Sequence, residues 1–316
     1  RALALVGCSA IASSLPGNCR LRKGVVPSAC NPAVIHMPKQ SLLADSPTQI
    51  INPDDVMEGL KITIRGWEDG ERYERQVETT DRWVLHTADE LKLTVEDDKS
   101  VTITQQPKAV NATRMGVGAC VWEGELFLAA YLASLPTYRY MGARVVELGA
   151  GPGLVGILLA KMGAKVHITD ISKVLPLINQ NIEANGIGPT QRRGASEGVA
   201  VAEELEWGKQ GYEQIVARLA SEPVDWCLAA DCCYIDQEGT SPSTPHFVRT
   251  CALLCGPTTR CFVCFELRSS EVQRVFLEEA SKAFEKVEQL PPYSLPKPCQ
   301  VEHILLYELS GSKLKT

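Results

Sequence analysis

The chain lacks the features that would place it in a membrane or on a nucleic acid. No apolar run in its 316 residues approaches the length of a membrane span. Basic residues are not in excess, because 32 Lys and Arg stand against 38 Asp and Glu and give a net charge of -6. A general binder of phosphate backbones needs the opposite balance. We therefore expect neither a membrane nor a nucleic acid as partner. We also expect a monomer.

Acidic residues are missing from the first 44 positions. That stretch has several serines and five basic residues: Arg1, Arg20, Arg22, Lys23 and Lys39. This composition is typical of an organellar transit peptide, so we exclude residues 1–44 from the fold and expect them to be disordered. Because the chain begins with Arg, we expect it to be incomplete or to carry translated leader sequence, with Met37 as a candidate start.

The cysteines lack the spacing of a zinc site or a disulfide framework. Of the twelve, Cys261 and Cys264 form the single C-x-x-C pair. Cys227, Cys232 and Cys233 fall in or beside apolar runs, where thiols pack as small hydrophobic groups. We predict no metal site and a reducing compartment, the cytoplasm, with an organelle as the alternative if residues 1–36 are a genuine transit peptide.

A glycine-rich turn at residues 149–153 organises the rest of the chain. Residues 144–148 are typical of a short buried strand, and apolar residues at helical spacing follow the turn. The dinucleotide pattern G-x-G-x-x-G would place its third glycine at position 154, which is Leu154. The pattern here is G-x-G-x-G with Glu147 just before it, which resembles the S-adenosylmethionine loop of class I methyltransferases. An NAD-dependent oxidoreductase is therefore disfavoured.

Strands alternate with helices from this turn onward, which predicts an α/β fold with a doubly wound, mainly parallel sheet of seven strands. Ligands of such sheets bind at the carboxyl ends of the strands. The glycine turn, Asp170, Trp207, Asp231 and Glu266 all follow or end predicted strands, so we expect them to meet in one cleft. A carboxylate at the end of the second strand, here Asp170, can accept hydrogen bonds from two ribose hydroxyls.

The stretch before the glycine turn alternates like β structure from about Gly59 to Gln105. It predicts a small antiparallel sheet that packs on the main domain or forms a lip facing the substrate. We therefore divide the chain into a leader (1–44), an N-terminal β extension (45–115) and a methyltransferase domain (116–316).

Several motifs together resemble the family 16 protein methyltransferases, and within them the methyltransferase-like 21 group of protein-lysine methyltransferases. The stretches that resemble this family are 121–123, 147–157, 169–170, 181–185, 205–208 and the D-x-x-Y of Asp231 and Tyr234. Residues 230–234 and 265–268 are most similar to the members that methylate the AAA ATPase valosin-containing protein. The resemblance implies an enzyme that transfers methyl groups to lysines of a protein, an AAA ATPase or another chaperone or translation-type protein.

The resemblance also implies the site residues. Those assigned to S-adenosylmethionine are Trp122, Glu147, Gly149, Ala150, Gly151, Gly153, Asp170, Trp207 and Ala230. Trp207 would lie against the adenine and Trp122 beside the methionine end, although either tryptophan could simply pack in the core. Asp231 and Tyr234 would line the opening for the lysine, and Glu266 would face the same cleft.

The predicted chemistry needs alignment and a neutral lysine amine, not a metal. Asp231 and Glu266 would orient the lysine ammonium, and no residue is assigned as a general base, because nearby carboxylates favour the charged amine. Two alternatives remain open. A class I methyltransferase acting on a small molecule would share the glycine turn, and so would a protein that binds the cofactor without turnover.

Overall fold

The computed structural model describes residues 61–77, 82–95, 99–109, 116–191, 198–234, 240–295 and 299–314. All of them belong to one compact unit, Ile50–Thr316. The predicted leader and its disorder lie outside these residues. Within the described ranges, no helix has both the length and the apolar character needed to cross a bilayer.

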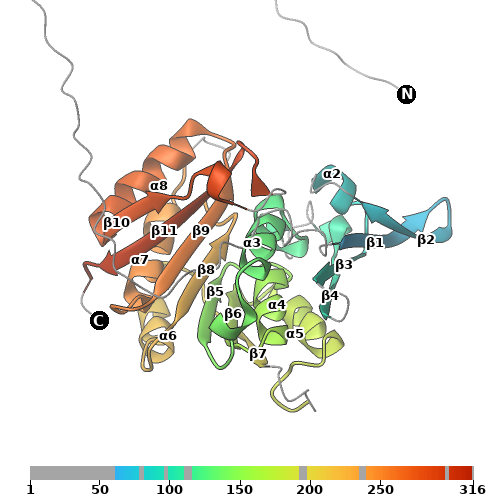
Figure 1. Ribbon diagram of the computed structural model, residues 1–316, viewed down its shortest axis with the longest axis horizontal. Coiled ribbons are helices and arrows are strands. Elements are labelled where there is room, and N and C mark those ends of the chain that lie inside the picture. Colours follow the sequence, from blue (N-terminus) through green and yellow to red (C-terminus); the bar gives the residue numbers. More distant parts are fainter. Residues whose placement is uncertain are drawn as a thin grey trace, which may run out of the picture. The chain divides into compact units, whose positions relative to one another are not determined.

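A seven-stranded sheet forms the centre of this unit (Figure 1). Its strands are β5 (Arg144–Leu148), β6 (Lys165–Asp170), β7 (Val199–Glu204), β8 (Trp226–Ala230), β9 (Arg260–Glu266), β10 (Phe284–Gln289) and β11 (Ile304–Ser312). Their spatial order is β10-β11-β9-β8-β5-β6-β7, and all neighbours are parallel except the pairs that contain β11. The predicted fold class is confirmed.

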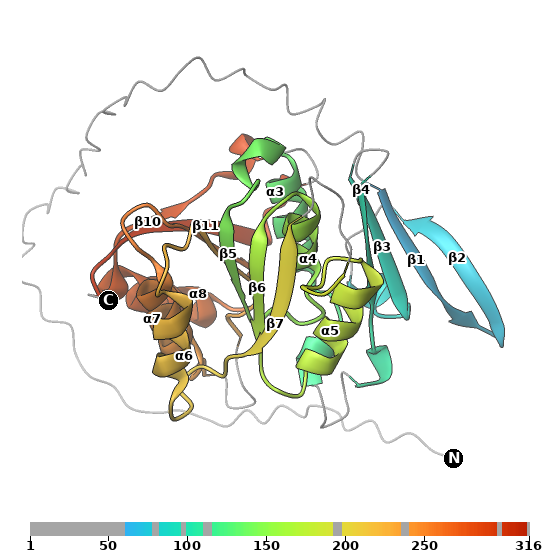
Figure 2. The same cartoon turned by 90° about the horizontal axis from the view of Figure 1, so that it is seen from below.

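Three helices cover each face of the sheet (Figure 2). One face carries α3 (Glu123–Ala133), α4 (Leu154–Lys161) and α5 (Leu175–Ala184), and the other carries α6 (Tyr212–Leu219), α7 (Thr244–Leu254) and α8 (Ser270–Ala283). Because both faces are covered, β8 is apolar and buried along its whole length. The chain runs outward from β5 to β6 and β7, and then returns to β8 on the other side of β5. The carboxyl ends of β5 and β8 therefore form the switch point at which such folds bind ligands.

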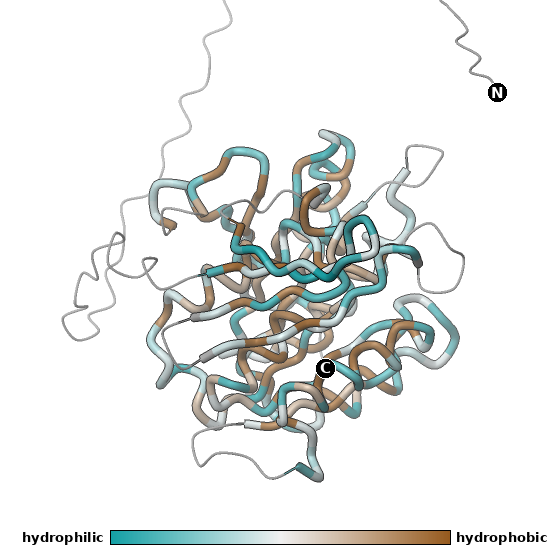
Figure 3. The backbone as a smooth tube through the Cα atoms, turned by 90° about the vertical axis from the view of Figure 1, so that its right-hand side faces the viewer, coloured by the Kyte–Doolittle hydropathy of each residue, from teal (hydrophilic) through white to brown (hydrophobic). Residues whose placement is uncertain are grey.

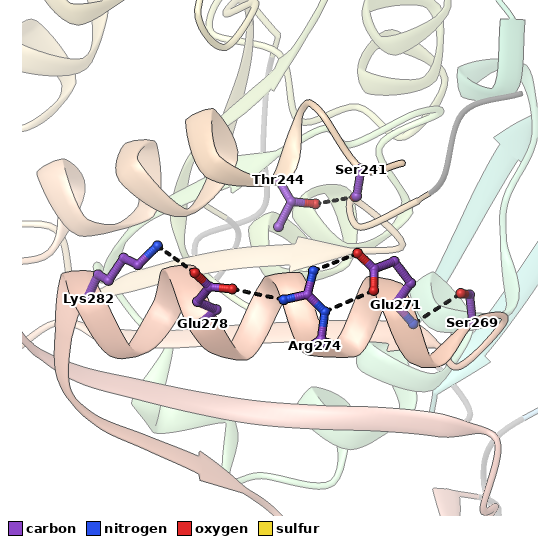
Figure 4. Close-up of polar contacts among 7 residues, drawn as sticks. All are labelled: Ser241, Thr244, Ser269, Glu271, Arg274, Glu278 and Lys282. Carbon is purple, nitrogen blue, oxygen red and sulfur yellow. Dashed lines mark hydrogen bonds and ion pairs between the residues drawn. The ribbon is translucent and has the colours of Figure 1, made fainter. Parts of the chain in front are cut away.

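Helix α8 shows how the sequence sets a helix start and an exposed face. Ser269 is the N-cap, and its hydroxyl accepts from the Glu271 N–H at 3.2 Å, although Ser270 and Gln273 have the spacing of a capping box one residue later. The adjacent serines make the two starts indistinguishable in sequence. Along the exposed face, Arg274 joins Glu271 and Glu278 through ion pairs (Figure 4).

The predicted antiparallel sheet is present before the glycine turn. Its strands are β1 (Lys61–Glu68), β2 (Glu71–Val77), β3 (Glu90–Val95) and β4 (Lys99–Thr104), in the order β2-β1-β3-β4. Asp69 and Gly70 turn the first hairpin with positive φ angles of 52° and 85°, as a tight hairpin requires. The edge strand β2 is charged and largely exposed, and it faces the viewer in teal in Figure 3. Such an edge resists pairing with another chain.

Two asparagines of α5 attach this sheet to the main domain. The Asn181 amide accepts from the Thr104 N–H at 2.8 Å and donates to the Thr104 carbonyl at 3.1 Å. Asn185 makes the same pair of bonds to Thr102, at 3.0 and 2.7 Å. The two amides thus satisfy the backbone of β4 as a neighbouring strand would. These contacts explain asparagines at both positions and give the sheet a packing role.

The remaining described elements are single turns that connect these layers. They are α2 (Arg82–Leu85) and the 3₁₀ turns η1 (Pro107–Ala109), η2 (Gly116–Ala119), η3 (Thr137–Arg139) and η4 (Pro292–Ser294).

Candidate functional site

The turn between β5 and α4 needs glycine both for its backbone angles and for the space beside neighbouring side chains. Gly149, Gly151 and Gly153 all have positive φ, at 58°, 52° and 89°, a region that L side chains rarely adopt. A Cβ at Gly149 would lie 2.8 Å from the Trp207 ring, so this position also needs glycine for space. Gly153 is the N-cap of α4.

Two carboxylates, Glu147 and Asp170, accept hydrogen bonds from backbone N–H groups in and near the turn. Glu147 accepts from the Gly156 N–H at 2.9 Å, and burial raises the pKa of this carboxyl to about 8. Asp170, at the end of β6, accepts from the N–H groups of Gly151 at 2.8 Å and Ile171 at 2.7 Å. Burial raises the pKa of Asp170 to about 6. Each Asp170 oxygen keeps a lone pair for a further donor.

A cavity of about 380 Å³ lies at the carboxyl ends of β5, β6, β7 and β8. Its walls are Val117, Gly118, Trp122, Glu125, Gly149, Gly151, Asp170, Ile171, Val174, Leu205, Glu206, Trp207, Ala230, Asp231, Cys232, Tyr234 and Ser243. Most of the predicted cofactor residues are among them. Glu147, Ala150 and Gly153 are not, although Glu147 and Gly153 fix the shape of the turn through their own contacts. The glycine turn, Asp170, Trp207 and Asp231 therefore meet at one cavity, whereas Glu266, which was predicted to join them, does not line it.

Three buried polar atoms among the described residues have no hydrogen-bond partner, and all three belong to the walls of this cavity. They are Glu125 Oε2, Trp207 Nε1 and Ser243 Oγ. Buried polar groups are nearly always paired, so these atoms point to a ligand that supplies a donor and an acceptor. Sequence reasoning missed Glu125 and Ser243. The available signal was that α3 is apolar around the rest of its circumference, which leaves an acid on it no route to water.

The two predicted tryptophans differ in what they offer the cavity. Trp122 donates its indole N–H to the Val117 carbonyl at 2.8 Å. Its ring packs edge-on to His86 and lies 4.5 Å from the Arg268 guanidinium carbon. Trp207 packs against Phe247 at 5.1 Å and keeps its indole N–H unpaired. Trp122 therefore supplies a wall, whereas Trp207 supplies a wall and a donor.

Asp231 lies in the cavity wall but also joins two elements. Its φ is 51°, and its carboxylate accepts from the Gly124 N–H at 2.7 Å and from the Glu266 N–H at 2.9 Å. Burial raises the pKa of Asp231. A Cβ at Gly124 would lie 2.5 Å from Asp231 Oδ2, so glycine allows this contact. Gly124 does not delay the helix start, since α3 begins at Glu123.

Tyr234 and Glu266 are in different environments. Tyr234 is 43% exposed at the cavity rim, and the Ser241 hydroxyl donates to its carbonyl at 2.6 Å. Ser241 also bonds Thr244 at the start of α7 (Figure 4). Glu266 accepts from Arg268 at 2.7 Å and is absent from the cavity wall. Its role toward a substrate stays a prediction.

Four thiols gather at the opposite, amino ends of β8 and β9. Cys227 and Cys261 are partners in the register of these strands, and their sulfur atoms lie within 4.8 Å of each other and of Cys251 on α7. The Cys255 thiol also forms hydrogen bonds with the thiols of Cys227 and Cys261. The hydrogen bond with Cys227 raises the pKa of Cys255. The single C-x-x-C pair of the sequence is not this group, since Cys264 takes no part in it.

The strand order, the G-x-G-x-G turn and the acid at the end of β6 define a class I methyltransferase fold, whose cofactor is S-adenosylmethionine. Residues 97–283 match the sequence model of a family described as lysine methyltransferases, and the chain belongs to that family.

The chain is similar to several named relatives. It is 30% identical to EEF1A lysine methyltransferase 3 of Xenopus tropicalis over 52% of this chain and 65% of the relative. It is 31% identical to the protein N-lysine methyltransferase METTL21A of Danio rerio, over 54% of this chain and 70% of the relative. For METTL21A of Mus musculus the identity is 36%, over 40% of this chain and 53% of the relative. The chain thus spans about half to two thirds of the first curated relatives it matches.

Similarity to solved structures is weaker. A T. Thermophilus 16S rRNA N2 G1207 methyltransferase in complex with AdoMet and guanosine aligns over 79% of this chain and 58% of that chain. The sequence identity is 14% and the TM-score 0.43. The finer resemblance to enzymes that methylate valosin-containing protein is not among these findings and stays a prediction.

Proposed function

We propose that the protein transfers methyl groups from S-adenosylmethionine to the ε-amine of a lysine in a protein substrate. The observation that supports this most directly is the cavity at the carboxyl ends of the strands, with its acidic walls and three unpaired buried atoms. Asp231 and Tyr234 are part of the same walls, and Tyr234 reaches solvent. A substrate side chain can therefore approach from outside while the cofactor occupies the interior.

The wall residues suit an adenosyl ligand. Asp170 keeps free lone pairs for ribose hydroxyls, and the Trp207 N–H and the Ser243 hydroxyl suit the ring nitrogens and amino group of adenine. The donor role of Trp207 adds to the predicted packing against adenine. When bound, S-adenosylmethionine supplies an electrophilic methyl group on a positively charged sulfur.

The side chains beside the opening orient the lysine rather than deprotonate it. A free lysine amine of pKa about 10.4 costs about 4–5 kcal/mol to deprotonate at pH 7. A neighbouring carboxylate such as Asp231 increases that cost, because it favours the ammonium form. Asp231 thus captures and positions the charged amine, and the proton leaves to water at the exposed rim. Tyr234 supplies an aromatic face that tolerates a methylated cation.

The substrate class follows from the relatives and from the resemblance of the site. The relatives' names include EEF1A lysine methyltransferases. Residues 230–234 and 265–268 resemble those of enzymes that act on an AAA ATPase. We therefore expect a translation factor or a chaperone-type ATPase as substrate. A reducing compartment, the cytoplasm, belongs to the same proposal and is supported by the free, buried cysteines of the described residues. We also expect a monomer.

The test follows radiolabel from S-adenosylmethionine into a cell lysate that is then separated into proteins and small molecules. Purified eEF1A and valosin-containing protein are assayed beside it, and mass spectrometry locates the modified residue. We expect label on lysine in the protein fraction, absent with Asp170→Ala. Label confined to small molecules would favour the small-molecule enzyme. Cofactor binding without any transfer would favour a non-catalytic protein.

A further inference from the structure

Glu125 is a buried acid in the cavity wall that no motif assigns. It is the third residue of α3 and only 2% exposed, and its Oε2 atom has no partner. An acid in a first helical turn usually faces solvent and interacts with the helix dipole. Glu125 cannot do so from this position, since the helix around it is buried from Glu123 to Leu132. A buried carboxylate oxygen without a partner is costly, and a ligand that donates a hydrogen bond to Oε2 would remove that cost.

The surroundings of Glu125 favour a cationic ligand. Asp170, Glu206 and Asp231 are also in the walls, whereas no Lys, Arg or His is among the described residues that line the cavity. Burial raises the pKa of Glu125 well above its usual range, and the neighbouring Glu147 and Asp231 raise it further. A positively charged group in the cavity would relieve both the desolvation and the repulsion.

The position of Glu125 identifies the end of the ligand that it meets. A Cβ at Gly151 would lie 3.2 Å from Glu125 Oε1, so the carboxyl group borders the middle of the glycine turn. Trp207 touches the turn at Gly149 instead. With adenine at Trp207 and the ribose at Asp170, the part of the cavity beside Glu125 and Trp122 is left for the aminoacyl end of the cofactor.

We propose that Glu125 binds the α-ammonium group of the cofactor's methionine end, as its counter-ion and hydrogen-bond acceptor. This rests on the proposed cofactor site and adds a specificity residue to it. The ammonium group is present in S-adenosylmethionine and in its product S-adenosylhomocysteine. It is absent from 5′-methylthioadenosine, which keeps the adenine, the ribose and a thioether sulfur. The three ligands therefore separate this contact from the rest of the cavity.

The experiment is calorimetry of S-adenosylhomocysteine and 5′-methylthioadenosine with the full chain and with Glu125→Gln. Losing a charge-assisted hydrogen bond should weaken S-adenosylhomocysteine about ten- to a hundredfold. The affinity for 5′-methylthioadenosine should change less than about twofold, because the matched ligand lacks the ammonium. An equal loss for both ligands, or no loss for either, would overturn the assignment. If the unaltered chain binds neither ligand, the proposed cofactor site itself fails.

A second measurement needs no variant. Burial raises the pKa of Glu125, and a bound ammonium group would lower it again, so Glu125 should release protons on binding at pH values between its pKa in the free and in the bound protein. Calorimetry in buffers of different ionisation enthalpy, repeated over a range of pH, counts these protons. The other titratable groups near the cavity are Cys120 before α3, Glu147 on β5, Asp170 on β6, Glu206 after β7, and Asp231, Cys232 and Tyr234 after β8. Both ligands carry the ribose that meets Asp170, so its contribution cancels. We expect more proton release with S-adenosylhomocysteine than with 5′-methylthioadenosine within this range of pH, and equal release at every pH would contradict the proposal.

Discussion

The two ends of the parallel sheet are built from similar strands but differ in how their polar groups are satisfied. At the carboxyl ends, acids border a cavity and three buried atoms have no partner. At the amino ends, Cys227, Cys251, Cys255 and Cys261 are buried and satisfy one another. The unpaired buried groups at the carboxyl ends lower the stability of the fold, whereas the buried thiols at the amino ends pack against one another. The comparison predicts that variants at the carboxyl ends change binding and transfer, and that variants at the amino ends change stability alone.

The largest effect is expected at Asp231, which belongs to the cavity and also joins α3 to β9. Asp231→Asn should slow methyl transfer about ten- to a hundredfold, because a charge-assisted contact to the lysine is lost. Asparagine has one acceptor oxygen for the two backbone N–H groups of Gly124 and Glu266, so the melting temperature should also fall. Transfer assays, melting curves and cofactor calorimetry are run together.

The control for Asp231 is Glu213→Gln, an exposed acid of α6 that is paired with Arg249 and is not part of the cavity wall, and it should slow transfer less than about threefold. If Asp231→Asn lowers the melting temperature and the folded fraction still turns over normally, Asp231 only joins the two elements. The small-molecule alternative would then move ahead.

The next effect concerns Asp170. Asp170→Ala should weaken S-adenosylmethionine at least about tenfold, a loss of roughly 1.4 kcal/mol or more, since the ribose contact and the support of Gly151 both go. The matched control is Glu206→Ala, another acid of the cavity wall that is exposed and paired with Lys209. Its effect should stay within about twofold. Unchanged affinity in a folded Asp170→Ala protein would remove Asp170 from the site.

A smaller effect is expected at the thiols. Cys261→Ser places a hydroxyl in an apolar core and should destabilise the fold by about 1–3 kcal/mol, while cofactor affinity stays the same. Metal analysis of the unaltered protein tests the prediction that these thiols do not form a metal site. A full equivalent of zinc that disappears in Cys261→Ser would show that the thiols are ligands and that the prediction is wrong.

The sequence predicted what depends on local pattern. The glycine turn, the alternation of strands and helices and the position of Asp170 are contiguous features, and each follows from backbone geometry. The alternation of β1, β3 and β4 was equally readable. Local pattern does not decide between Ser269 and Ser270 as the start of α8, because neighbouring serines offer the same cap.

What the sequence could not predict depends on contacts between distant residues. Gly124 and Asp231 are 107 positions apart, so nothing local indicates that the glycine makes room for the carboxylate. The place of Glu125 in the cavity also depends on distant residues, because β8, β9, β11 and α4 pack around α3 and bury it. The thiol cluster forms from strand register and one helix, which sequence spacing does not reveal.

The smallest expected effect is a pH dependence at the carboxyl ends that the amino ends should not show. The pKa of Asp170 is raised to about 6 in the free protein, and ribose hydroxyls favour its ionised form. Binding therefore lowers this pKa, and affinity is full at high pH and falls as the pH drops through about 6. 5′-Methylthioadenosine isolates the effect, since it carries the ribose without the ammonium that would meet Glu125. Its affinity should fall up to about fourfold between pH 7 and pH 5.5, in step with the ionised fraction of Asp170. Asp170→Asn binds more weakly but should show no such slope, and Cys261→Ser should keep the slope of the unaltered protein. A flat profile in the unaltered protein, with melting curves showing it folded at both pH values, would mean that Asp170 does not titrate against the ligand.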